Sequence, residues 1–225
     1  MKKDEMAPIV VKGMKIAMDT MACCSTPCYK NHVSLSGRYL FNSMQGTRTM
    51  LENNGFLLGQ EAWEFQLRLF QFPKVFYSHQ LGTLTDAGRY VSVTGFGLKE
   101  DIRFPIVNTE NVWITPYIEL GGGIYRMNLV RNVSTNSIST ALNGSVDQTT
   151  IDNFVVSGDV GLELGFGFAF DQRRFRLLMN GGYISNVPLE WRIAGSLAFS
   201  EKLSLSTPYA GVTLQLEMQD MECCK

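Results

Sequence analysis

The chain has only two histidines that could serve as a general base, which limits hydrolytic schemes. The only histidines are His32 and His79, and histidine is the usual general base near neutral pH. His32 and Ser34 are two residues apart, so on a β-strand they would share one face and place a base near a hydroxyl. The pair is a candidate for hydrolysis by a serine nucleophile. The alternative is a histidine that makes ordinary hydrogen bonds inside the protein. Asp159 and Glu163 would lie about 13 Å apart along a strand, so pairing with arginine explains them better than catalysis.

The segment that holds Asp159 and Glu163 shows what kind of element must position these residues. Residues 154–170, FVVSGDVGLELGFGFAF, alternate apolar side chains with small or acidic ones, which predicts a strand with two unlike faces. At about 3.3 Å per residue it would span roughly 55 Å, whereas ordinary strands have about 5 to 6 residues. This length favours a strand that crosses a lipid bilayer. The side chains expected to face lipid, here and in 208–218, are Phe154, Leu162, Leu164, Phe166, Phe168, Leu214 and Leu216.

The same alternation recurs in several other segments, and charged residues occupy the face opposite the apolar one. These residues are Arg38, Glu64, Arg68, Glu119, Asp159, Glu163, Arg174, Arg176 and Glu217. On a soluble sandwich they would form a solvated face, and the apolar faces would meet in a core. In a membrane barrel they would pair in the lumen, because unpaired buried charges cost several kcal/mol each. Strand length favours the barrel, in which Gly161, Gly165 and Gly167 are expected to make room for long charged side chains.

Composition limits the remaining possibilities. The chain has 225 residues, 18% of them charged, and a formal net charge of −1. We therefore expect one all-β domain over 1–225, with 1–30 not clearly assigned and a polar tail at 219–225. No nucleic-acid partner, cofactor or transmembrane helix is expected. The basic start is not expected to be an export signal, because Lys12, Lys15 and Asp19 interrupt its apolar residues.

Nine segments have strand character, although bacterial barrels of this type have even strand numbers, eight or possibly ten here. The nine are 8–18, 31–43, 61–72, 88–104, 111–126, 153–171, 173–184, 188–200 and 207–218. The preferred count treats 188–200 as an extension of the last outer loop, which leaves 19–30, 73–87, 127–152 and 185–206 as loops on one side and puts His79 in a loop. The other count omits 8–18. The faces of 89–105 are less regular, which suggests a β-bulge.

The cysteines lie near the two ends of the chain. They are Cys23, Cys24, Cys28, Cys223 and Cys224. Disulfides between the two groups are possible only if both lie on the same side of the membrane, as in the count that omits 8–18. The spacing matches no standard zinc site, so no metal is expected.

Four segments together resemble the C-terminal half of small outer-membrane β-barrels of the opacity-protein kind. They are TPYIELGGGIYRMNL, DVGLELGFGFAF, RFRLLMNGGY and PYAGVTLQLEM, within residues 111–218. The resemblance implies a closed antiparallel up-and-down barrel of eight transmembrane strands, with short periplasmic turns and long outer loops. The chain departs from that family at its N-terminal end and in its last residues, LEMQDMECCK, which lack the usual terminal aromatic.

The expected function is that of a non-enzymatic small barrel in the bacterial outer membrane, with a lumen filled by charged side chains. It would be structural or adhesive, or would bind another envelope or surface protein through its outer loops. One alternative is a lipid A-modifying hydrolase that uses His32 and Ser34. The H-x-S order is similar to that of outer-membrane lipid A deacylases, although Leu35, Met44 and Gly46 stand where that family has its asparagine and orienting glutamate. The other alternative is a soluble lipocalin-like barrel that binds a small apolar ligand.

Overall fold

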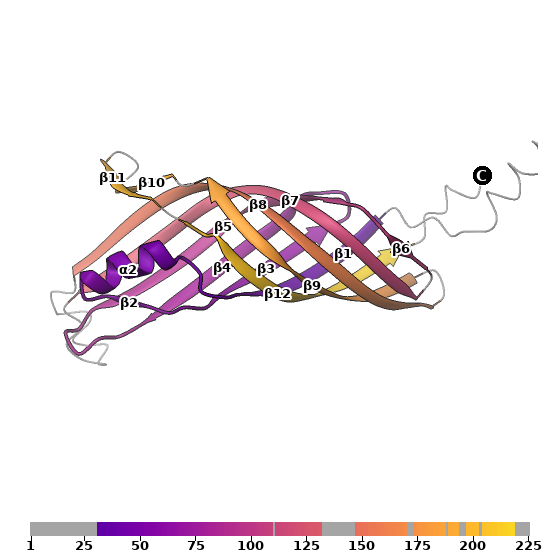
Figure 1. Cartoon of the computed structure of the whole chain (residues 1–225), viewed down its shortest axis with the longest axis horizontal. Coiled ribbons are helices and arrows are strands. Elements are labelled where there is room, and N and C mark those ends of the chain that lie inside the picture. Colours follow the sequence, from indigo (N-terminus) through magenta and orange to yellow (C-terminus); the bar gives the residue numbers. More distant parts are fainter. Residues whose placement is uncertain are drawn as a thin grey trace, which may run out of the picture.

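The wall of the molecule is a closed barrel of eight antiparallel strands (Figure 1). The computed structural model describes residues 31–109, 111–131, 147–170, 173–187, 189–193, 197–202 and 204–218. The wall strands are β1 (Asn31–Leu40), β3 (Ala62–Leu69), β4 (Lys74–Thr83), β5 (Tyr90–Arg103), β7 (Val112–Arg131), β8 (Asp147–Phe170), β9 (Arg173–Val187) and β12 (Thr207–Met218). Each strand pairs with the next in this order, and β12 pairs back with β1 from Asn31↔Met218 to Leu40↔Tyr209. The predicted all-β, up-and-down, eight-stranded fold is thereby confirmed.

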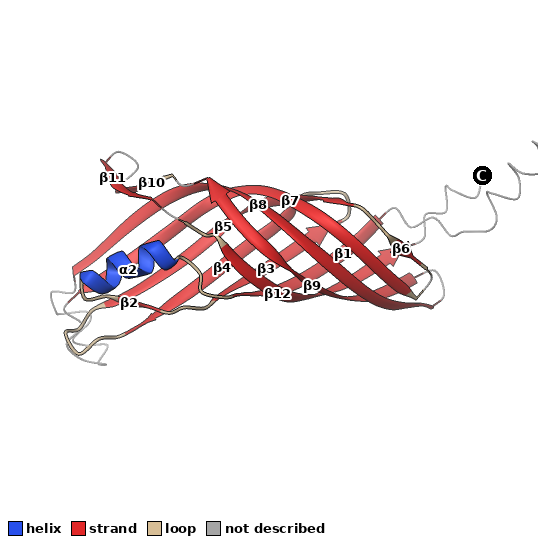
Figure 2. Cartoon of the chain, in the orientation of Figure 1, coloured by secondary structure: helices blue, strands red, loops and turns tan. Residues whose placement is uncertain are grey.

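Short elements are attached to this wall (Figure 2). They are helix α2 (Gln45–Asn53) and strands β2 (Leu57–Leu58), β6 (Val107–Asn108), β10 (Glu190–Ile193) and β11 (Leu197–Lys202). β2 pairs with β4, β6 with β7, and β10 with both β8 and β11. Within the part of the chain that the structure describes, no helix is long and apolar enough to cross a membrane.

The two ends of the barrel differ in the length of their connections. At one end the chain turns between β3 and β4, between β5 and β7, and between β8 and β9, and there the first residue of β1 meets the last of β12. At the other end the connections 41–61, 84–89, 132–146 and 188–206 join the strands. Helix α2 lies at this long-connection end (Figure 1). The longest strands, β7 and β8, extend toward it beyond the last residue pair of β8 with β9, Val156↔Val187.

The number of wall strands is the eight that was predicted, but the set of strands differs from both predicted sets because β4 is one of the eight. Placing 73–87, and with it His79, in a loop was wrong: Lys74–Thr83 is a strand that pairs with β3 and β5. Its alternation is masked by Phe76, which points inward and is 2% exposed. The segment 188–200 lies outside the wall, as the preferred count expected, whereas 8–18 and the five cysteines lie outside the described residues.

The expected bulge in 89–105 is not found, since β5 pairs with β7 without a register shift from Tyr90 to Arg103. The sequence pattern of its two faces is irregular because the inward side chains change from apolar to charged along the strand. Val91 and Val93 are buried in an apolar cluster at the long-connection end, while Lys99 is buried among charges farther along. The barrel interior therefore has an ionic middle and an apolar end.

The inward glycines of β8 make room for aromatic rings and not, as expected, for charged side chains. A Cβ atom at Gly161 would lie 2.7 Å from the ring and hydroxyl of Tyr117 and from the Tyr209 hydroxyl. A Cβ at Gly165 or Gly167 would lie 3.0 Å or less from the Trp113 ring. Space in this narrow lumen is limited by rings that cross it, so a side chain at these positions would force them to move.

Gly161→Val should therefore destabilise the barrel by about 1 to 3 kcal/mol, because the added methyl groups overpack the lumen. The matched control is Gly158→Val on the outer face of the same strand, where the nearest atom to an added Cβ is a Leu120 methyl at 3.4 Å. Urea unfolding midpoints of the refolded variants would measure the difference. Equal midpoints for the two variants would contradict the tight lumen.

Candidate functional site

The centre of the lumen holds a cluster of three cations and three anions, here called the ionic cluster. Its members are Arg38 of β1, Glu64 of β3, Lys74 of β4, Lys99 of β5, Glu119 of β7 and Asp159 of β8. All six side chains are buried. They come together because each occupies an inward position of a strand whose outward neighbours are largely apolar. Six of the eight wall strands thus contribute one charge each to a single site.

Arg38 connects the three acids of the cluster. Its Nη1 lies 2.8 Å from Glu119 Oε1, 2.9 Å from Asp159 Oδ2 and 3.3 Å from Glu64 Oε1. Its Nη2 donates a second bond to Glu119 at 3.2 Å, which makes that pair bidentate. The guanidinium carbon lies 4.6 Å from the centre of the Tyr209 ring. This arginine is therefore neutralised on one side and stacked on the other.

The two lysines complete the charge balance. Lys99 Nζ lies 2.9 Å from Glu64 Oε1, 3.2 Å from Asp159 Oδ2 and 3.5 Å from Glu119 Oε1. Lys74 Nζ contacts Glu119 as well, and Gln66 Nε2 donates to both Glu64 and Glu119. The cluster therefore balances three positive and three negative charges, and each charge has more than one polar partner. A buried ionic group is tolerated only under such conditions.

A second group of charges continues the network toward the short-turn end. Asp101 accepts from Arg68 and Arg103, and its carboxylate lies 3.2 Å from Lys74 Nζ, which joins it to the ionic cluster. Arg103 Nη1 also lies 3.1 Å from Glu163 Oε1. The void lined by Arg38, Asp101 and Glu163, among others, has a volume of only about 10 Å³, which is about one water molecule. The side chains therefore fill this part of the lumen.

The remaining predicted charges lie on the other side of the lumen, near Trp113. Arg176 Nη2 lies 3.1 Å from Glu217 Oε2, and its guanidinium carbon lies 4.0 Å from the centre of the Trp113 ring. Arg174 lies over the same ring at 5.8 Å. All nine residues of the predicted network thus occur on the lumen side, but in three connected or neighbouring groups instead of one.

Sequence reasoning missed four charged members of the network: Lys74, Lys99, Asp101 and Arg103. Three of them alternate in the stretch KEDIR of β5, and this period of two was a usable signal. It was obscured by the apolar inward residues earlier in the same strand. Lys74 was missed with the whole of β4.

The candidate catalytic pair lies on the lumen side and not on the outer side of the wall. The Ser34 side chain is buried and lines the void beside Arg38, and His32 is half-buried on the same face of β1. Leu35, the residue after Ser34, points to the opposite face of the strand and is 58% exposed on the outside. A lipid chain lying against the barrel would meet Leu35 and not the serine hydroxyl. Among the described residues, no group of three or more histidine, cysteine, aspartate or glutamate side chains could hold a metal ion.

The fold and the site together define a small closed antiparallel barrel with paired charges in the middle of its lumen. No family model matches this chain, and no curated protein matches it. Among solved structures, the chain is similar to the N-terminal β-barrel domain of OprF from Pseudomonas aeruginosa. The match has 11% identity and a TM-score of 0.33, and it covers 85% of this chain and 100% of that domain. Membership of the opacity-protein kind stays a prediction.

Replacing Glu119 by glutamine should destabilise the barrel by about 3 to 5 kcal/mol, because Arg38 and the two lysines would keep their charges without their shared partner. Glu100→Gln is the matched control. Glu100 also accepts from an arginine, Arg68, but its side chain is 54% exposed, so the loss should stay under about 1 kcal/mol. Urea unfolding of both variants would test this, and a Glu119→Gln barrel as stable as the control would contradict the role of the cluster.

Proposed function

We propose that this chain is a small bacterial outer-membrane β-barrel that spans the bilayer, is closed to bulk flow by its ionic cluster, and acts without catalysis through its long-connection end. The observation that carries this proposal is the inverted distribution of side chains: charges are buried inside, while large apolar side chains are exposed on the outside of every wall strand. A soluble lipocalin-like barrel would need the opposite arrangement, with an apolar interior and a polar outer surface.

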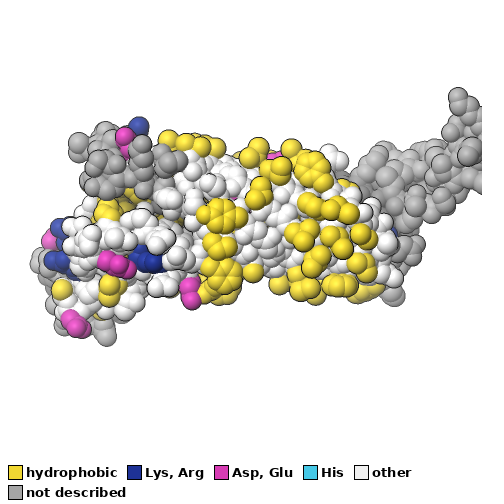
Figure 3. All heavy atoms as spheres, in the orientation of Figure 1, with side chains coloured by type: hydrophobic (Ala, Val, Ile, Leu, Met, Phe, Trp, Pro, Cys, Tyr) yellow, Lys and Arg dark blue, Asp and Glu magenta, His cyan; other side chains and the backbone are white. Residues whose placement is uncertain are grey.

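Exposed apolar side chains occur on all eight wall strands, and Figure 3 shows those on one face of the barrel; together they are here called the belt. The expected lipid-facing residues Phe154, Leu162, Leu164, Phe166, Phe168 and Leu214 are 40–62% exposed on it, and Leu216 is half-buried. Soluble monomers rarely expose a contiguous apolar patch of more than a few hundred Å², whereas here large apolar side chains are exposed on every wall strand. Hydrocarbon chains are the solvent that would cover it.

The height of the belt fits a bilayer. On β7 the exposed apolar residues run from Val112 to Ile124, about 40 Å along the strand. With a strand tilt of about 35 to 45°, this corresponds to about 28 to 32 Å across the membrane, close to a hydrocarbon core of about 30 Å. Two residues beyond Ile124, Arg126 is exposed and pairs with Asp152 at 2.8 Å, as expected where the wall leaves the lipid.

Aromatic residues mark the same border. On the outer face, the Tyr39 ring contacts Phe41 and Trp63 edge-on, each with ring centres 4.9 Å apart. Trp63 is 52% exposed. Tryptophan and tyrosine are enriched where a membrane meets water, because their rings are apolar and their tips polar. This group supports placing the long-connection end outside the lipid, and charged side chains gather at that end in Figure 3.

The direction of the strands supports a role for the long-connection end as the outer surface. In barrels of this class the short turns face the periplasm and the long connections face outward. Helix α2 and the connections around it would then be presented to the surroundings of the cell. The proposed partners are outer-membrane lipid along the belt and another envelope or surface protein at this end. Inward placement of Ser34 supports the non-enzymatic reading over lipid hydrolysis.

Placing an arginine in the middle of the belt tests the lipid contact. Leu162→Arg should destabilise the barrel in lipid vesicles by about 2 to 4 kcal/mol. Gln148→Arg is the control, because Gln148 is exposed on the same strand but lies beyond the belt. The two variants should be compared by urea unfolding in vesicles, together with heat-modifiable gel mobility and membrane fractionation of cells. Recovery of the wild-type protein as a monodisperse soluble species without detergent would contradict a membrane location.

The closed lumen predicts that the wild-type barrel gives no large, stable conductance in planar bilayers, because the buried charges leave no continuous water path. Folding of the recorded sample would be checked by its heat-modifiable mobility, and a porin of known conductance recorded in the same bilayer would be the positive control. A large, stable open level from the folded protein would refute the occluded lumen without refuting membrane insertion.

A further inference from the structure

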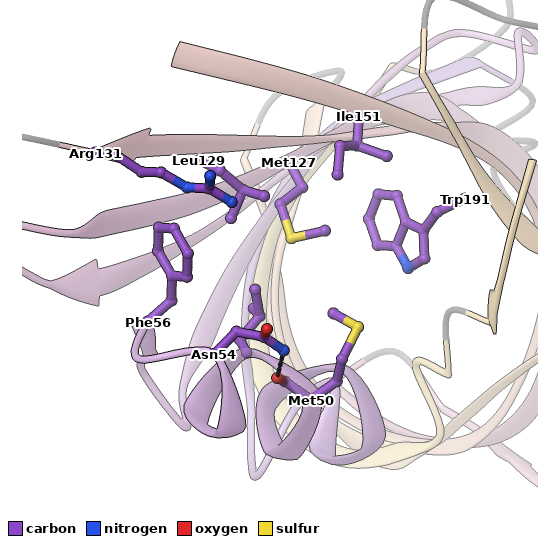
Figure 4. Close-up of a pocket in the computed structure, with 9 residues that line it drawn as sticks. Met50, Asn54, Phe56, Met127, Leu129, Arg131, Ile151 and Trp191 are labelled. Atoms are coloured by element: carbon purple, nitrogen blue, oxygen red, sulfur yellow. Dashed lines mark hydrogen bonds between the residues drawn. The ribbon is translucent and has the colours of Figure 1, made fainter. Parts of the chain in front are cut away.

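The apolar end of the barrel interior contains an open pocket that the ionic cluster does not use, here called the mouth pocket. It has a volume of about 210 Å³ and lies between α2, β7, β8 and β10 (Figure 4). It is lined by Met50, Leu51, Asn54, Phe56, Met127, Leu129, Arg131, Ile151 and Trp191. The pocket is built entirely within the long-connection end, so its existence does not depend on the proposed membrane location.

The lining sets the size and polarity of a ligand. Two flexible thioethers, Met50 and Met127, face the space from opposite sides, and the indole of Trp191 closes one end (Figure 4). Methionine adapts its shape to apolar partners. For size, an enclosed apolar cavity of about 150 Å³ accepts a molecule of the size of benzene. The mouth pocket therefore suits a compact apolar molecule of about six to eight carbon atoms.

Two polar features define the ends of the pocket. Trp191 is 2% exposed, and its Nε1–H has no hydrogen-bond partner among the residues that the structure describes. A buried indole N–H normally has a partner, so this donor is available to a ligand. At the other end, Arg131 lies 5.8 Å from the centre of the Phe56 ring and opposite Asp147 in the β7–β8 register. The charges at that end are of both signs, which gives no preference for an anion.

We propose that the mouth pocket binds a small, neutral, mainly apolar molecule with one hydrogen-bond acceptor, such as a medium-chain alcohol. Its carbon chain lies between Met50 and Met127, and its oxygen accepts from Trp191 Nε1–H. The site is separate from the belt, where apolar molecules would also adsorb. The test must therefore distinguish saturable binding in the mouth pocket from non-specific adsorption on the apolar belt.

The probe is a photoreactive diazirine analogue of 1-octanol, applied to the refolded full-length protein, with labelled peptides mapped by mass spectrometry. Labelling of the segments around Met127 and Trp191 should saturate and be competed by excess 1-octanol. Leu129→Trp fills the pocket and should lower this labelling at least about fivefold, equivalent to about 1 kcal/mol. Leu120→Trp is the matched control: it is the same substitution on the same strand, at a side chain that is 60% exposed on the outside.

Trp191→Phe tests the hydrogen bond, because it keeps an aromatic wall and removes the donor. It should weaken competition by 1-octanol at least about fivefold and leave competition by n-octane unchanged. Heat-modifiable mobility shows that each variant is folded. Labelling confined to the belt, or an equal effect of Leu129→Trp and Leu120→Trp, would overturn the site. Unchanged competition by 1-octanol in Trp191→Phe would overturn the assigned donor.

Discussion

The structure depends on one electrostatic constraint: a charged side chain that is buried away from water must have a partner of opposite charge. The centre of this barrel buries six charged side chains. Arg38 contacts three carboxylates, and each carboxylate belongs to a different strand. A shift of any of these strands by one residue would turn its charge to the outside and leave a buried partner unpaired. The ionic cluster therefore specifies the register of the wall as well as filling it. A buried cluster of this kind often contributes little net stability, so its main effect here is on the register of the strands.

Much of this arrangement could be predicted from the sequence, because a period of two is visible wherever one face is uniform. Over residues 156–168 of β8 and 210–217 of β12 the outer face is largely apolar and the inner face is small, polar or charged, so both strands and their faces were identified. The prediction failed where the inner face is not uniform. β4 buries Phe76, and β5 buries Val91 and Val93, so that apolar residues fall on both faces. No pattern of single residues shows that the lumen changes from ionic to apolar along its axis, because that change is set by α2 packing over one end.

The change along the lumen explains how one narrow barrel can contain both a closed plug and a pocket. In the middle, long side chains from opposite walls meet, and rings such as Tyr117 and Tyr209 cross the lumen with their hydroxyls 2.6 Å apart. Toward the long-connection end, β7 and β8 continue beyond the end of their pairing with β9. There Leu51 of α2, Phe56 and Trp191 pack in the apolar cluster that covers the inner faces of β7 and β8. Helix α2 and the β10–β11 hairpin do not fill this end completely, and the mouth pocket is the space that remains.

The seam between β1 and β12 has a consequence for how the chain reaches this state. Residues that touch across it, such as Ser36 and Thr213, are 177 positions apart, so the contact order of the closing step is high and the search for it is slow. Until the last strand arrives, the growing sheet has two open edges, and unpaired edges invite aggregation. Pairing of β12 with β1 therefore removes both unpaired edges in a single step.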